Sequence, residues 1–417
     1  MIIGNKEIKI LAFRPFVYTD NGPGNNRMRA FIRELAASGF RVTCFALVPP
    51  ECDVQSIIED EKRYGINVIL CNSPFSADKM TFREYLERWV GVRLLPVFQN
   101  TFTENFVTRH KLKKILQKER FDCLFTSYVP MGALHIAAKL SKKFNTPWIA
   151  DLRDIPDELD TSREKRLTRL HARVLEKVCK TAKAILTVSP PLVDGLKERY
   201  NLPGSHVIYN GFDDDQFFRP DRFDKANQFR ISYCGSLGAG RNPDLLFAGL
   251  DLLLGRDVDL SDVTVSFYGK SHSQKLHGIS KDWESLSLVR FEGMLPREEI
   301  FDVYRKSGLL LSLSSPGFQG ILTSKIFEYA ASFRPILSVP PDHDALDDFI
   351  QRAKIGRSCG SAEEVANFIH SNLLHWRETG KLPQTKPDVQ FLAQFSRKAQ
   401  AGILAKIILD NVVNRNA

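Results

Sequence analysis

Short apolar runs that alternate with amphipathic stretches restrict the fold of this 417-residue chain more than any other feature. The first run is KILAF at 9–13, and a helical pattern follows it at 25–38. Further strand-like runs are RVTCFAL, NVILC, CLFTS, PWIAD and TAKAILTVS, the later ones separated by helical segments. Such alternation is typical of a parallel sheet covered by helices, so we predict an α/β fold.

The pattern begins again after residue 228. The second set of runs is FRISYCGSL, VTVSFYG, SLVRFEG, GLLLSLS and PILSVP. The chain is too long for one ordinary core, and its 43% of hydrophobic residues can fill two. We therefore predict two doubly wound, Rossmann-like domains, at 1–205 and 206–391.

The C-terminal tail has helical spacing of its apolar residues between 392 and 412. These residues are Leu392, Phe395, Ala399, Ile403, Leu404, Ile407 and Ile408. A helix with such a face needs an apolar surface to cover. We expect the segment 392–417 to pack back on the N-terminal domain.

The net charge of +9 and the pI near 9.1 favour an acidic partner. Nucleic acid, anionic lipid and a phosphorylated substrate all satisfy this condition. Nucleic acid ranks last, because no dense basic run with interleaved aromatic residues and no nucleic-acid module is present. Charge alone does not choose between lipid and substrate.

Seven scattered cysteines without a C-x-x-C pair predict free thiols in a reducing compartment. The start of the chain lacks the features of a signal peptide. No apolar run approaches the roughly 20 residues that cross a bilayer. We expect a cytoplasmic protein, either soluble or peripheral on the inner face of a membrane.

Three glycine-containing loops follow strands, where doubly wound sheets bind their ligands. In TDNGPGNNR, Gly22, Gly24 and Asn25 can open a helix whose amino end accepts an anion, with Arg27 one turn on. A plain strand-to-helix turn explains this loop nearly as well. In CGSLGAGRNPDLL, the small residues Gly235, Ser236, Gly238 and Gly240 precede Arg241, which can donate to a diphosphate or be a surface charge.

The third loop lies in SSPGFQGILTSKIFEYAASFRPIL at 314–337. Lys325 and Glu328 are three residues apart at the start of a helix, so they share a face. Lysine can neutralise a phosphate and a carboxylate can accept hydrogen bonds from ribose hydroxyls. An exposed ion pair is the alternative, but the apolar residues around the pair favour a packed helix whose polar face points at a ligand.

Residues after two strands of the first half form a second candidate region. Tyr128 and His135 follow CLF in TSYVPMGALHIAAKL, and Asp151 and Asp154 lie in WIADLRD. Asp154 can accept a hydrogen bond from an acceptor hydroxyl, or it can pair with an arginine as part of the structure. His135 shares a helix face with apolar residues and is more typical of a packing histidine.

Several of these segments resemble the retaining glycosyltransferases of family four. TSKIFEYAASFRPIL is similar to their P-x-K-x-x-E-Y-x-A-x-G-x-P-I-L segment, and SHVIYNGFDDDQF to V-x-x-N-G-x-D. ISYCGSLGAGRNPDLLFAGL resembles their donor loop, and PWIADLRD the P-W-(I/V)-A-D-x-R-D of one branch. FEGMLPREEIFDVYRKSGLLLSLSS resembles a further segment that ends in tyrosine. The matches cover most of the chain in the expected order.

The resemblance implies the GT-B fold, with two Rossmann-like domains facing each other across a cleft. It implies a nucleotide-diphosphate sugar as donor, and a saccharide or lipid-linked saccharide as acceptor. It also implies a retaining transfer without cofactor or metal, in polysaccharide or glycolipid assembly. In this scheme Arg241 and Lys325 act on the diphosphate and Asp154 on the acceptor. The donor contacts are Gly235, Ser236, Gly238, Gly240, Gln319, Gly320, Ile321, Leu322, Thr323 and Glu328, and the acceptor-side contacts are Gly22, Gly24, Asn25, Arg27, Tyr128, His135 and Asp151.

Two departures from the family pattern bear on activity. Gly320 stands where relatives carry the first of two glutamates, so Gln319 or the loop backbone must replace that carboxylate. Ser236 stands where many relatives have arginine, so the donor loop depends on Arg241. A non-catalytic nucleotide-binding subunit and a sugar-nucleotide epimerase remain as alternative functions.

The stretch 81–118 combines basic and aromatic residues. They are Arg83, Arg88, Arg93, Arg109, Lys111, Lys113 and Lys114 with Trp89, Phe98, Phe102 and Phe106. This combination is typical of helices at an anionic membrane surface. A packed helix with a solvated basic edge explains it as well, so both interpretations stay open.

Overall fold

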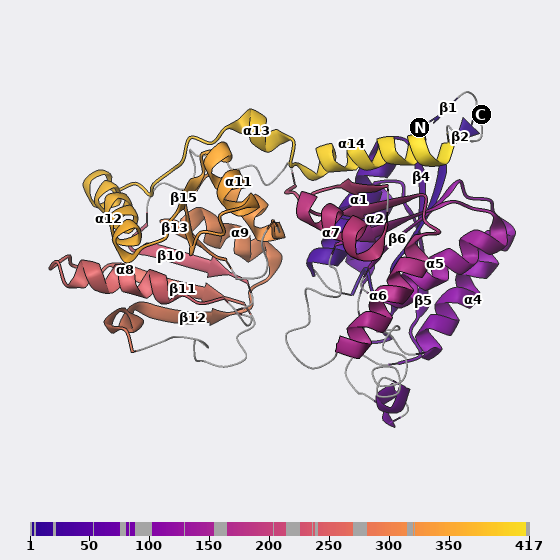
Figure 1. The fold of residues 1–417 in the computed structure, drawn as a ribbon, viewed down its shortest axis with the longest axis horizontal. Helices are drawn as coiled ribbons and strands as arrows, with labels where there is room; N and C mark the ends of the chain where they lie inside the picture. Colours follow the sequence, from indigo (N-terminus) through magenta and orange to yellow (C-terminus); the bar gives the residue numbers. More distant parts are fainter. Residues whose placement is uncertain are drawn as a thin grey trace. The chain divides into compact units, whose positions relative to one another are not determined.

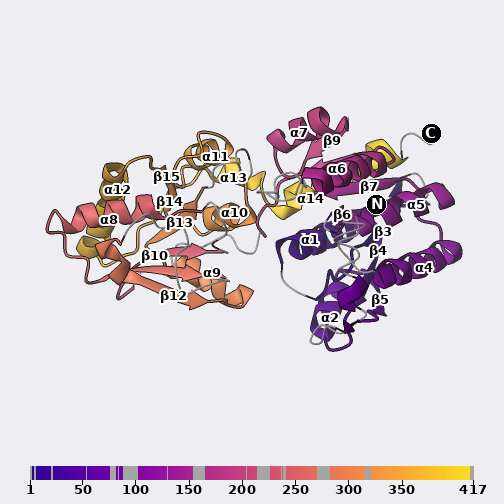
Figure 2. The same ribbon diagram turned by 60° about the horizontal axis from the view of Figure 1, so that its bottom comes forward.

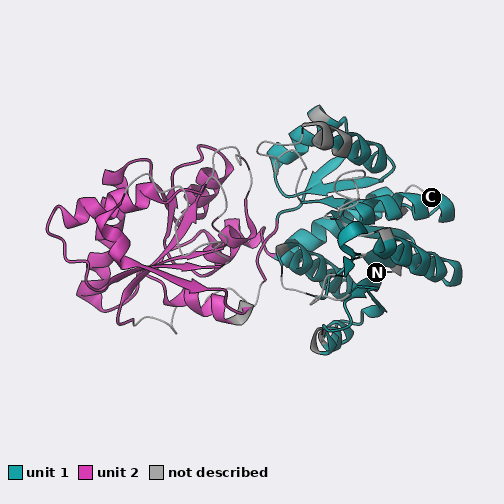
Figure 3. Cartoon of the chain, turned by 90° about the horizontal axis from the view of Figure 1, so that it is seen from below, with its two compact units in different colours: residues 1–209, 397–417 teal, residues 210–396 magenta. Residues whose placement is uncertain are grey.

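The chain forms two compact units in a computed structural model (Figure 3). Unit 1 comprises residues 1–209 and 397–417, and unit 2 comprises residues 210–396. The sequence predicts boundaries at 205/206 and 391/392. The structure describes residues 2–3, 6–19, 22–52, 54–75, 81–82, 84–87, 102–128, 130–153, 165–202, 204–213, 226–235, 237, 241–269, 282–314, 320 and 322–413.

Unit 1 contains a seven-stranded parallel sheet, and each strand predicted for the first half is present. In spatial order its strands are β5 (Asn67–Asn72), β4 (Arg41–Val48), β3 (Lys9–Phe13), β6 (Cys123–Tyr128), β7 (Trp148–Leu152), β8 (Ala184–Thr187) and β9 (Ser205–Val207). A two-stranded antiparallel sheet, β1 (Ile2–Ile3) with β2 (Lys6–Glu7), precedes it. β6 and β7 are buried along their whole length, because helices cover both faces of the sheet centre. The strand order reverses between β3 and β6, the place where sheets of this kind bind ligands.

The helices of unit 1 include one from the far end of the chain. They are α1 (Pro23–Ala37), α2 (Gln55–Arg63), α4 (Phe102–Lys118), α5 (Met131–Phe144), α6 (Lys165–Cys179), α7 (Pro190–Tyr200) and α14 (Arg397–Ile408), which a π-helical turn extends (Leu409–Val413). α14, yellow in Figure 1, lies beside α1. Its Leu404 and Ile408 enter the core that holds Met28 and Phe31. The expected return of the C-terminal helix to the N-terminal domain is confirmed.

The single helix expected from 392 to 412 is wrong in its first part. The structure has a short helix, α13 (Val389–Ala393), in unit 2 and begins α14 at Arg397. Phe395 packs its ring on Phe327 and Phe349 of unit 2, and its carbonyl accepts the N–H of Phe212. Residues 394–396, between α13 and α14, are not helical. The ring contacts of Phe395 and its main-chain hydrogen bond with Phe212 take the place of helical hydrogen bonds there.

Unit 2 contains a six-stranded parallel sheet that also reverses its order at the centre. In spatial order its strands are β12 (Val289–Gly293), β11 (Val263–Tyr268), β10 (Phe229–Cys234), β13 (Leu309–Leu313), β14 (Ile336–Val339) and β15 (Gly356–Ser358). The reversal falls between β10 and β13. All five strands predicted for this half are present, and β15 adds an edge strand that the sequence analysis does not predict.

The helices of unit 2 position the ends of these strands. They are α8 (Asp244–Leu254), the 3-10 helix η5 (Glu284–Leu288), α9 (Arg297–Lys306), α10 (Ser324–Ala331), α11 (Ala345–Ala353), α12 (Ala362–Thr379) and α13. α8 and α12 lie side by side (Figures 1 and 2). A Cβ on Gly249 would lie 2.4 Å from Val365 Cγ1, so glycine is what lets the two helices touch.

Each unit thus has its own hydrophobic core and its own doubly wound sheet. The predicted fold class is confirmed for both halves. All seven cysteines are free thiols, as the sequence predicts. None of the helices in the described ranges has the length and apolar character of a membrane-spanning segment.

Candidate functional site

The carboxyl ends of β10 and β11 approach each other closely because each strand continues into a glycine. Gly235 and Gly269 both have a φ of 144°, which side chains rarely permit. The N–H of Gly235 donates to Tyr268 O at 2.7 Å, and a Cβ on Gly269 would lie 2.4 Å from Gly235 O. Gly235 is exposed. A ligand can therefore approach the backbone at the end of β10.

Lys325 stands near the amino end of α10 and reaches the end of β10. Its Nζ lies 3.9 Å from the centroid of the Tyr233 ring. Arg241 Nη1 donates a hydrogen bond to Tyr233 Oη at 3.3 Å. Two cations that the sequence assigns to the same ligand therefore meet at one phenol. The structure brings together the pair that the sequence analysis proposes for the diphosphate.

The Lys325 ammonium is buried and forms no ion pair with a carboxylate of the described residues. Within the described ranges its Nζ has no hydrogen-bond partner, and its close contact is with the aromatic face of Tyr233. Charges inside proteins are normally paired, because an unpaired buried charge is unfavourable. The contact with a ring offsets part of that cost. An anion at this position would supply the missing partner.

The cluster shifts the pKa of both groups at its centre. Burial lowers the pKa of Lys325 below the usual 10.5, and Arg241 lowers it further, although Tyr233 opposes the change. Burial acts to raise the pKa of Tyr233, but Lys325 and Arg241 outweigh it, and the pKa is lowered. The lowered pKa of Tyr233 indicates an excess of positive charge around the phenol, whereas burial is the main cause of the shift at Lys325.

Glu328 is buried on α10 and is held by a tyrosine from α9. Tyr304 Oη donates to Glu328 Oε2 at 3.1 Å, and burial followed by the Glu328 charge raises the pKa of Tyr304 well above its usual value. The rings of Tyr304 and Tyr329 pack edge to face, 5.1 Å apart. Tyr329 Oη accepts the N–H of Cys234 at 2.8 Å. These contacts fix α10 against β10 and α9.

The turn that leads into α10 explains the departure from the family pattern at Gly320. Gly320 is buried with a φ of 76°, a left-handed conformation that favours glycine over glutamate. Leu322 is 4% exposed, and its carbonyl accepts the Asn210 amide at 3.4 Å. Thr323 is the residue that precedes the helix, and its side chain makes no capping hydrogen bond.

Part of the predicted site lies outside the described residues. These positions are Asp154, Ser236, Gly238, Gly240, Gln319 and Ile321. The described remainder of the donor set, on β10, on α10 and at its entry, belongs to unit 2. The acceptor-side set belongs to unit 1.

Arg27 and Asp151 pair with each other inside unit 1. Arg27 Nη2 lies 3.0 Å from Asp151 Oδ1, and the two side chains are 2% and 1% exposed. The guanidinium also donates to Tyr209 O at 2.7 Å and Ile208 O at 2.9 Å. Ser127 Oγ donates to Asp151 Oδ2 at 3.0 Å. The pair therefore holds α1, β7 and the end of β9 together, and the predicted contact of these two residues with an acceptor stays a prediction.

Gly24 lies buried at the amino end of α1 against two guanidinium groups. A Cβ on Gly24 would lie 2.5 Å from Arg14 Nη1 and 2.7 Å from Arg153 Nη1. Arg14 directly follows β3 and Arg153 directly follows β7. Neither arginine is among the site residues predicted from the sequence. The available signal is a basic residue immediately after a strand of a doubly wound sheet.

The other acceptor-side residues lie at the amino end of α1, at the end of β6 and on α5. Gly22 precedes α1 and its carbonyl accepts the N–H of Asn25 at 3.0 Å. The Asn25 amide donates to Phe16 O at 3.0 Å, which fixes the turn. Tyr128 ends β6 and is 1% exposed. His135 is half-buried on α5, and burial followed by nearby cations lowers its pKa, so the imidazole is neutral at neutral pH.

Tyr233 and Tyr304 are the residues of this site that the sequence analysis does not single out. Tyr304 is the tyrosine that ends the segment FEGMLPREEIFDVY, so the family pattern contained the signal. Tyr233 is one aromatic residue in a buried strand, and nothing in its local sequence separates it from a core residue.

Comparisons with known proteins agree with this architecture. Residues 24–216 match the model of the family described as Glycosyltransferase Family 4. No curated protein matches the chain in sequence. Sucrose-phosphate synthase from Thermosynechococcus elongatus is similar in structure, with a TM-score of 0.66 and 14% identity over 97% of this chain and 99% of that one.

Two further solved structures are similar over nearly the full length. A glycosyltransferase from Rickettsia africae has a TM-score of 0.62 and 14% identity, covering 98% of this chain and 99% of that one. HepE from Anabaena, in complex with UDP and glucose, has a TM-score of 0.61 and 16% identity, covering 97% and 100%. The family match covers residues 24–216, and the structural similarity shows that the chain as a whole has the GT-B fold.

Proposed function

We propose that this chain is a glycosyltransferase that takes a sugar from a nucleotide-diphosphate donor bound on unit 2 and transfers it to a hydroxyl acceptor. The observation that carries the proposal is the buried Lys325 ammonium, which lies with Arg241 against Tyr233 and pairs with no carboxylate in the part of the chain that the structure describes. A diphosphate is the anion that fits two cations beside exposed glycine backbone. The complex of the similar protein HepE with UDP and glucose supports this choice.

Lys325 and Arg241 act on the leaving group in the proposed reaction. The bond between the anomeric carbon and the diphosphate oxygen breaks, and negative charge builds up on the diphosphate. Cations fixed in a buried site stabilise that charge without having to reorganise, which is the largest contribution to many enzymatic rates. The cluster at Tyr233 is therefore the part of the site that lowers the barrier.

The resemblance to family four favours retention of the anomeric configuration. In the proposed route the acceptor oxygen attacks on the face that the diphosphate leaves. A new bond forms between this oxygen and the anomeric carbon, and a phosphate oxygen takes the acceptor proton. This route requires no protein nucleophile, cofactor or metal ion.

Glu328 binds the ribose in this proposal. Its carboxylate is held by Tyr304 at 3.1 Å, so its orientation is fixed before the nucleotide arrives. The sugar itself meets no glutamate at position 320, because a left-handed backbone occupies that place. Main-chain groups around Gly320 or the amide of Gln319 hold the sugar hydroxyls instead.

Nucleotide-sugar turnover tests the proposal. A thermal-shift screen with UDP-, GDP-, ADP- and dTDP-sugars identifies the donor, and hydrolysis or transfer is then measured with it. Lys325→Ala should lower both activities by about 10² to 10³-fold. Lys306 is an exposed lysine on α9 of the same unit, and Lys306→Ala should leave both unchanged.

Other outcomes select the rival functions. Nucleotide affinity without any turnover would favour a non-catalytic binding subunit. Interconversion of free sugar nucleotides would favour an epimerase. Either result would contradict the transfer reaction.

The basic surface of α4 and α5 supports a proposal for the acceptor side. Lys113 is the main cause that lowers the pKa of Lys143, and Arg109 adds to it, so like charges crowd together there. Phe106 on α4 is 61% exposed. We propose that this surface binds anionic headgroups at the inner face of a membrane, where polysaccharide or glycolipid assembly supplies a lipid-linked acceptor.

Cosedimentation with anionic liposomes at low salt tests this surface. Replacing Lys113 and Phe106 together by alanine should reduce the fraction of protein bound to liposomes. Replacing the exposed Lys180, which directly follows α6, by alanine should not. No cosedimentation of the unmodified protein would remove the membrane from the proposal. Arg83, Arg88, Arg93, Trp89 and Phe98, which the sequence analysis also assigns to this surface, lie outside the described residues.

A further inference from the structure

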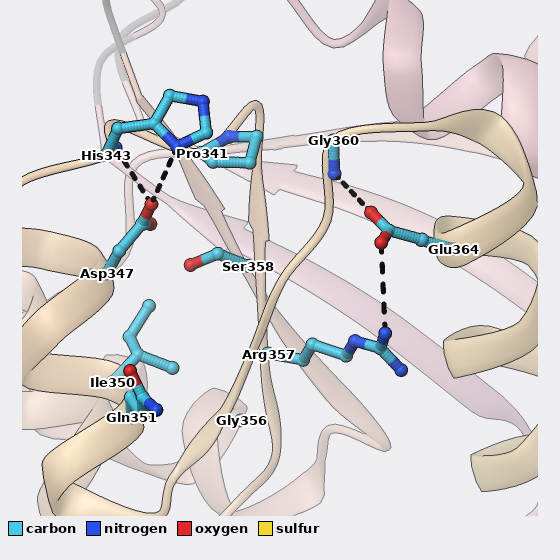
Figure 4. Close-up of a pocket in the computed structure, with 10 residues that line it drawn as sticks. All are labelled: Pro341, His343, Asp347, Ile350, Gln351, Gly356, Arg357, Ser358, Gly360 and Glu364. Atoms are coloured by element: carbon cyan, nitrogen blue, oxygen red, sulfur yellow. Dashed lines mark hydrogen bonds and ion pairs between the residues drawn. The ribbon is translucent and has the colours of Figure 1, made fainter.

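A cavity of about 510 Å³ opens in unit 2 between α11, β15 and the amino end of α12 (Figure 4). The residues proposed to bind the nucleotide lie on β10, on α10 and in the loops beside them, and none of them lines it. A volume of this size is within the range of about 300 to 1,000 Å³ that small-molecule sites occupy. The cavity is thus a separate candidate site at the β15 edge of the sheet, away from the central strands β10 and β13.

Two buried oxygens in this cavity have no hydrogen-bond partner within the described part of the chain. They are Asp347 Oδ1, on α11, and Ser358 Oγ, at the end of β15. Figure 4 shows the Ser358 hydroxyl pointing toward the side of the cavity from which Asp347 comes. Asp347 Oδ2 accepts the N–H of His343 at 2.8 Å, so the carboxylate is fixed in place. Buried polar atoms are normally satisfied, and a pair from two elements aimed at one cavity indicates a ligand with hydroxyl groups.

The charges around the cavity exclude an anionic ligand. Asp347 and Glu364 both line it, and the one guanidinium, Arg357, lies 3.9 Å from Glu364 Oε1. Glu364 Oε2 also accepts the N–H of Gly360 at 2.7 Å. A phosphate in this cavity would be repelled by the carboxylates of Asp347 and Glu364. The only arginine among the lining residues, Arg357, already faces Glu364.

A metal ion does not fit either. No group of three or more His, Cys, Asp or Glu side chains within the described ranges is arranged to hold one. Hard cations take several oxygen ligands, more than Asp347 and Ser358 supply.

The remaining surface of the cavity suits the carbon skeleton of a sugar. Pro341 and Ile350 give apolar contacts, and Gln351 offers both a donor and an acceptor. We propose that this cavity binds a neutral saccharide, with hydroxyl groups donating to Asp347 Oδ1 and Ser358 Oγ and C–H groups packed on Pro341. The site is separate from the transfer site and does not depend on it.

Saccharide binding to the full chain, measured without nucleotide, tests the proposal. The probes are the neutral trisaccharides of glucose, galactose, mannose and N-acetylglucosamine, observed by saturation-transfer NMR and titration calorimetry. At least one should bind. Loss of a hydrogen bond to a charged group weakens binding by about tenfold or more, so Asp347→Ala should have that effect. Ser358→Ala removes a neutral acceptor instead of a charged one, so it should weaken binding by a smaller factor of about three to ten.

Asp348→Ala is the matched control, because this residue is the next one on α11, is 61% exposed and does not line the cavity. It should bind the saccharide as the unmodified protein does. The proposal is overturned if none of the trisaccharides binds at about 10 mM, far above ordinary biological dissociation constants, or if Ser358→Ala and Asp347→Ala both bind normally. In those cases the cavity holds water alone. Nucleotide affinity, measured in the same variants, should stay unchanged, which separates this outcome from failure of the transfer site.

Discussion

Each unit has a buried cationic group near the centre of its sheet, but only the one in unit 1 is paired with a carboxylate of the described residues. In unit 1, Arg27 meets Asp151 and two main-chain carbonyls, and both side chains are almost fully buried. In unit 2, Lys325 meets an aromatic ring and a second cation, Arg241, through Tyr233. The first arrangement is complete within the protein, whereas the second lacks an anion. A cation with a built-in partner holds the fold together, and a cation without one marks where a ligand belongs.

Removing the arginine of the completed pair should have the largest effect on stability. Arg27→Ala leaves Asp151 buried and unpaired, so the free energy of unfolding should fall by about 3 to 5 kcal/mol. Chemical denaturation of the purified variant measures this. The double variant Arg27→Met with Asp151→Leu should recover much of the loss, because no unpaired charge remains. A stable Arg27→Ala protein would contradict the structural role of the pair.

Lys325→Ala should show the opposite pattern. Transfer should fall by about 10² to 10³-fold, the effect of removing one stabilising group from a developing anion, or roughly 3 to 4 kcal/mol. The free energy of unfolding should stay the same or rise, because a buried unpaired charge is gone. Rates and denaturation are measured on the same preparation. A large loss of stability with little loss of activity would show that Lys325 has a structural role like that of Arg27, and it would contradict the proposed difference between the two units.

Restoring the family glutamate should destabilise unit 2. Gly320 has a φ of 76°, and a side chain in the left-handed region costs roughly 1 to 2 kcal/mol. Gly320→Glu and Gly320→Ala should lower the free energy of unfolding by similar amounts, since both carry the same backbone strain. Equal stability of Gly320→Glu and the unmodified protein would show that the backbone does not decide the residue at this position.

Tyr304→Phe should have the smallest effect. The variant keeps the ring against Tyr329 but loses the hydrogen bond to Glu328. Nucleotide affinity should fall about two- to tenfold, the usual worth of one such bond, with melting temperature nearly unchanged. Calorimetric titration with the donor nucleotide checks this. Unchanged affinity would remove Tyr304 as the residue that positions the ribose-binding carboxylate.

The sequence predicts the strands well, because buried parallel strands are short apolar runs with glycine or helical breaks on either side. KILAF, CLFTS and GLLLSLS all became central strands. The stretch 392–412 shows the limit of periodicity. Its apolar spacing continues through residues 394–396, but Phe395 packs in unit 2 while Leu404 packs in unit 1.

Site residues could be predicted where a single segment of the sequence contains them all. They could not be predicted where residues far apart in the sequence contact each other. Lys325 and Glu328 stand out because they share one helix face. The partners that decide what each buried cation does are far away in sequence. Asp151 is 124 residues from Arg27, and Tyr233 reaches Lys325 of α10 from strand β10. No periodicity or local motif contains such pairings. The local sequence therefore does not distinguish Arg27, which has a structural role, from Lys325, which we propose binds a ligand.

The direct test of the unsatisfied cation is the pKa of Lys325 with and without a nucleoside diphosphate. Burial lowers this pKa in the free protein. The unfolded chain therefore binds more protons between the lowered pKa and 10.5, and stability should rise with pH across that window. A bound diphosphate should reverse the shift, because an adjacent negative charge favours the ammonium.

Carbon-13 NMR of the lysine Cε resonances follows this titration, and the Lys325→Arg variant identifies the signal. UDP, GDP, ADP and dTDP are added in turn. We expect the Lys325 pKa to begin below 10.5 and to rise when one of these nucleotides binds. A pKa that none of the four changes would contradict the account.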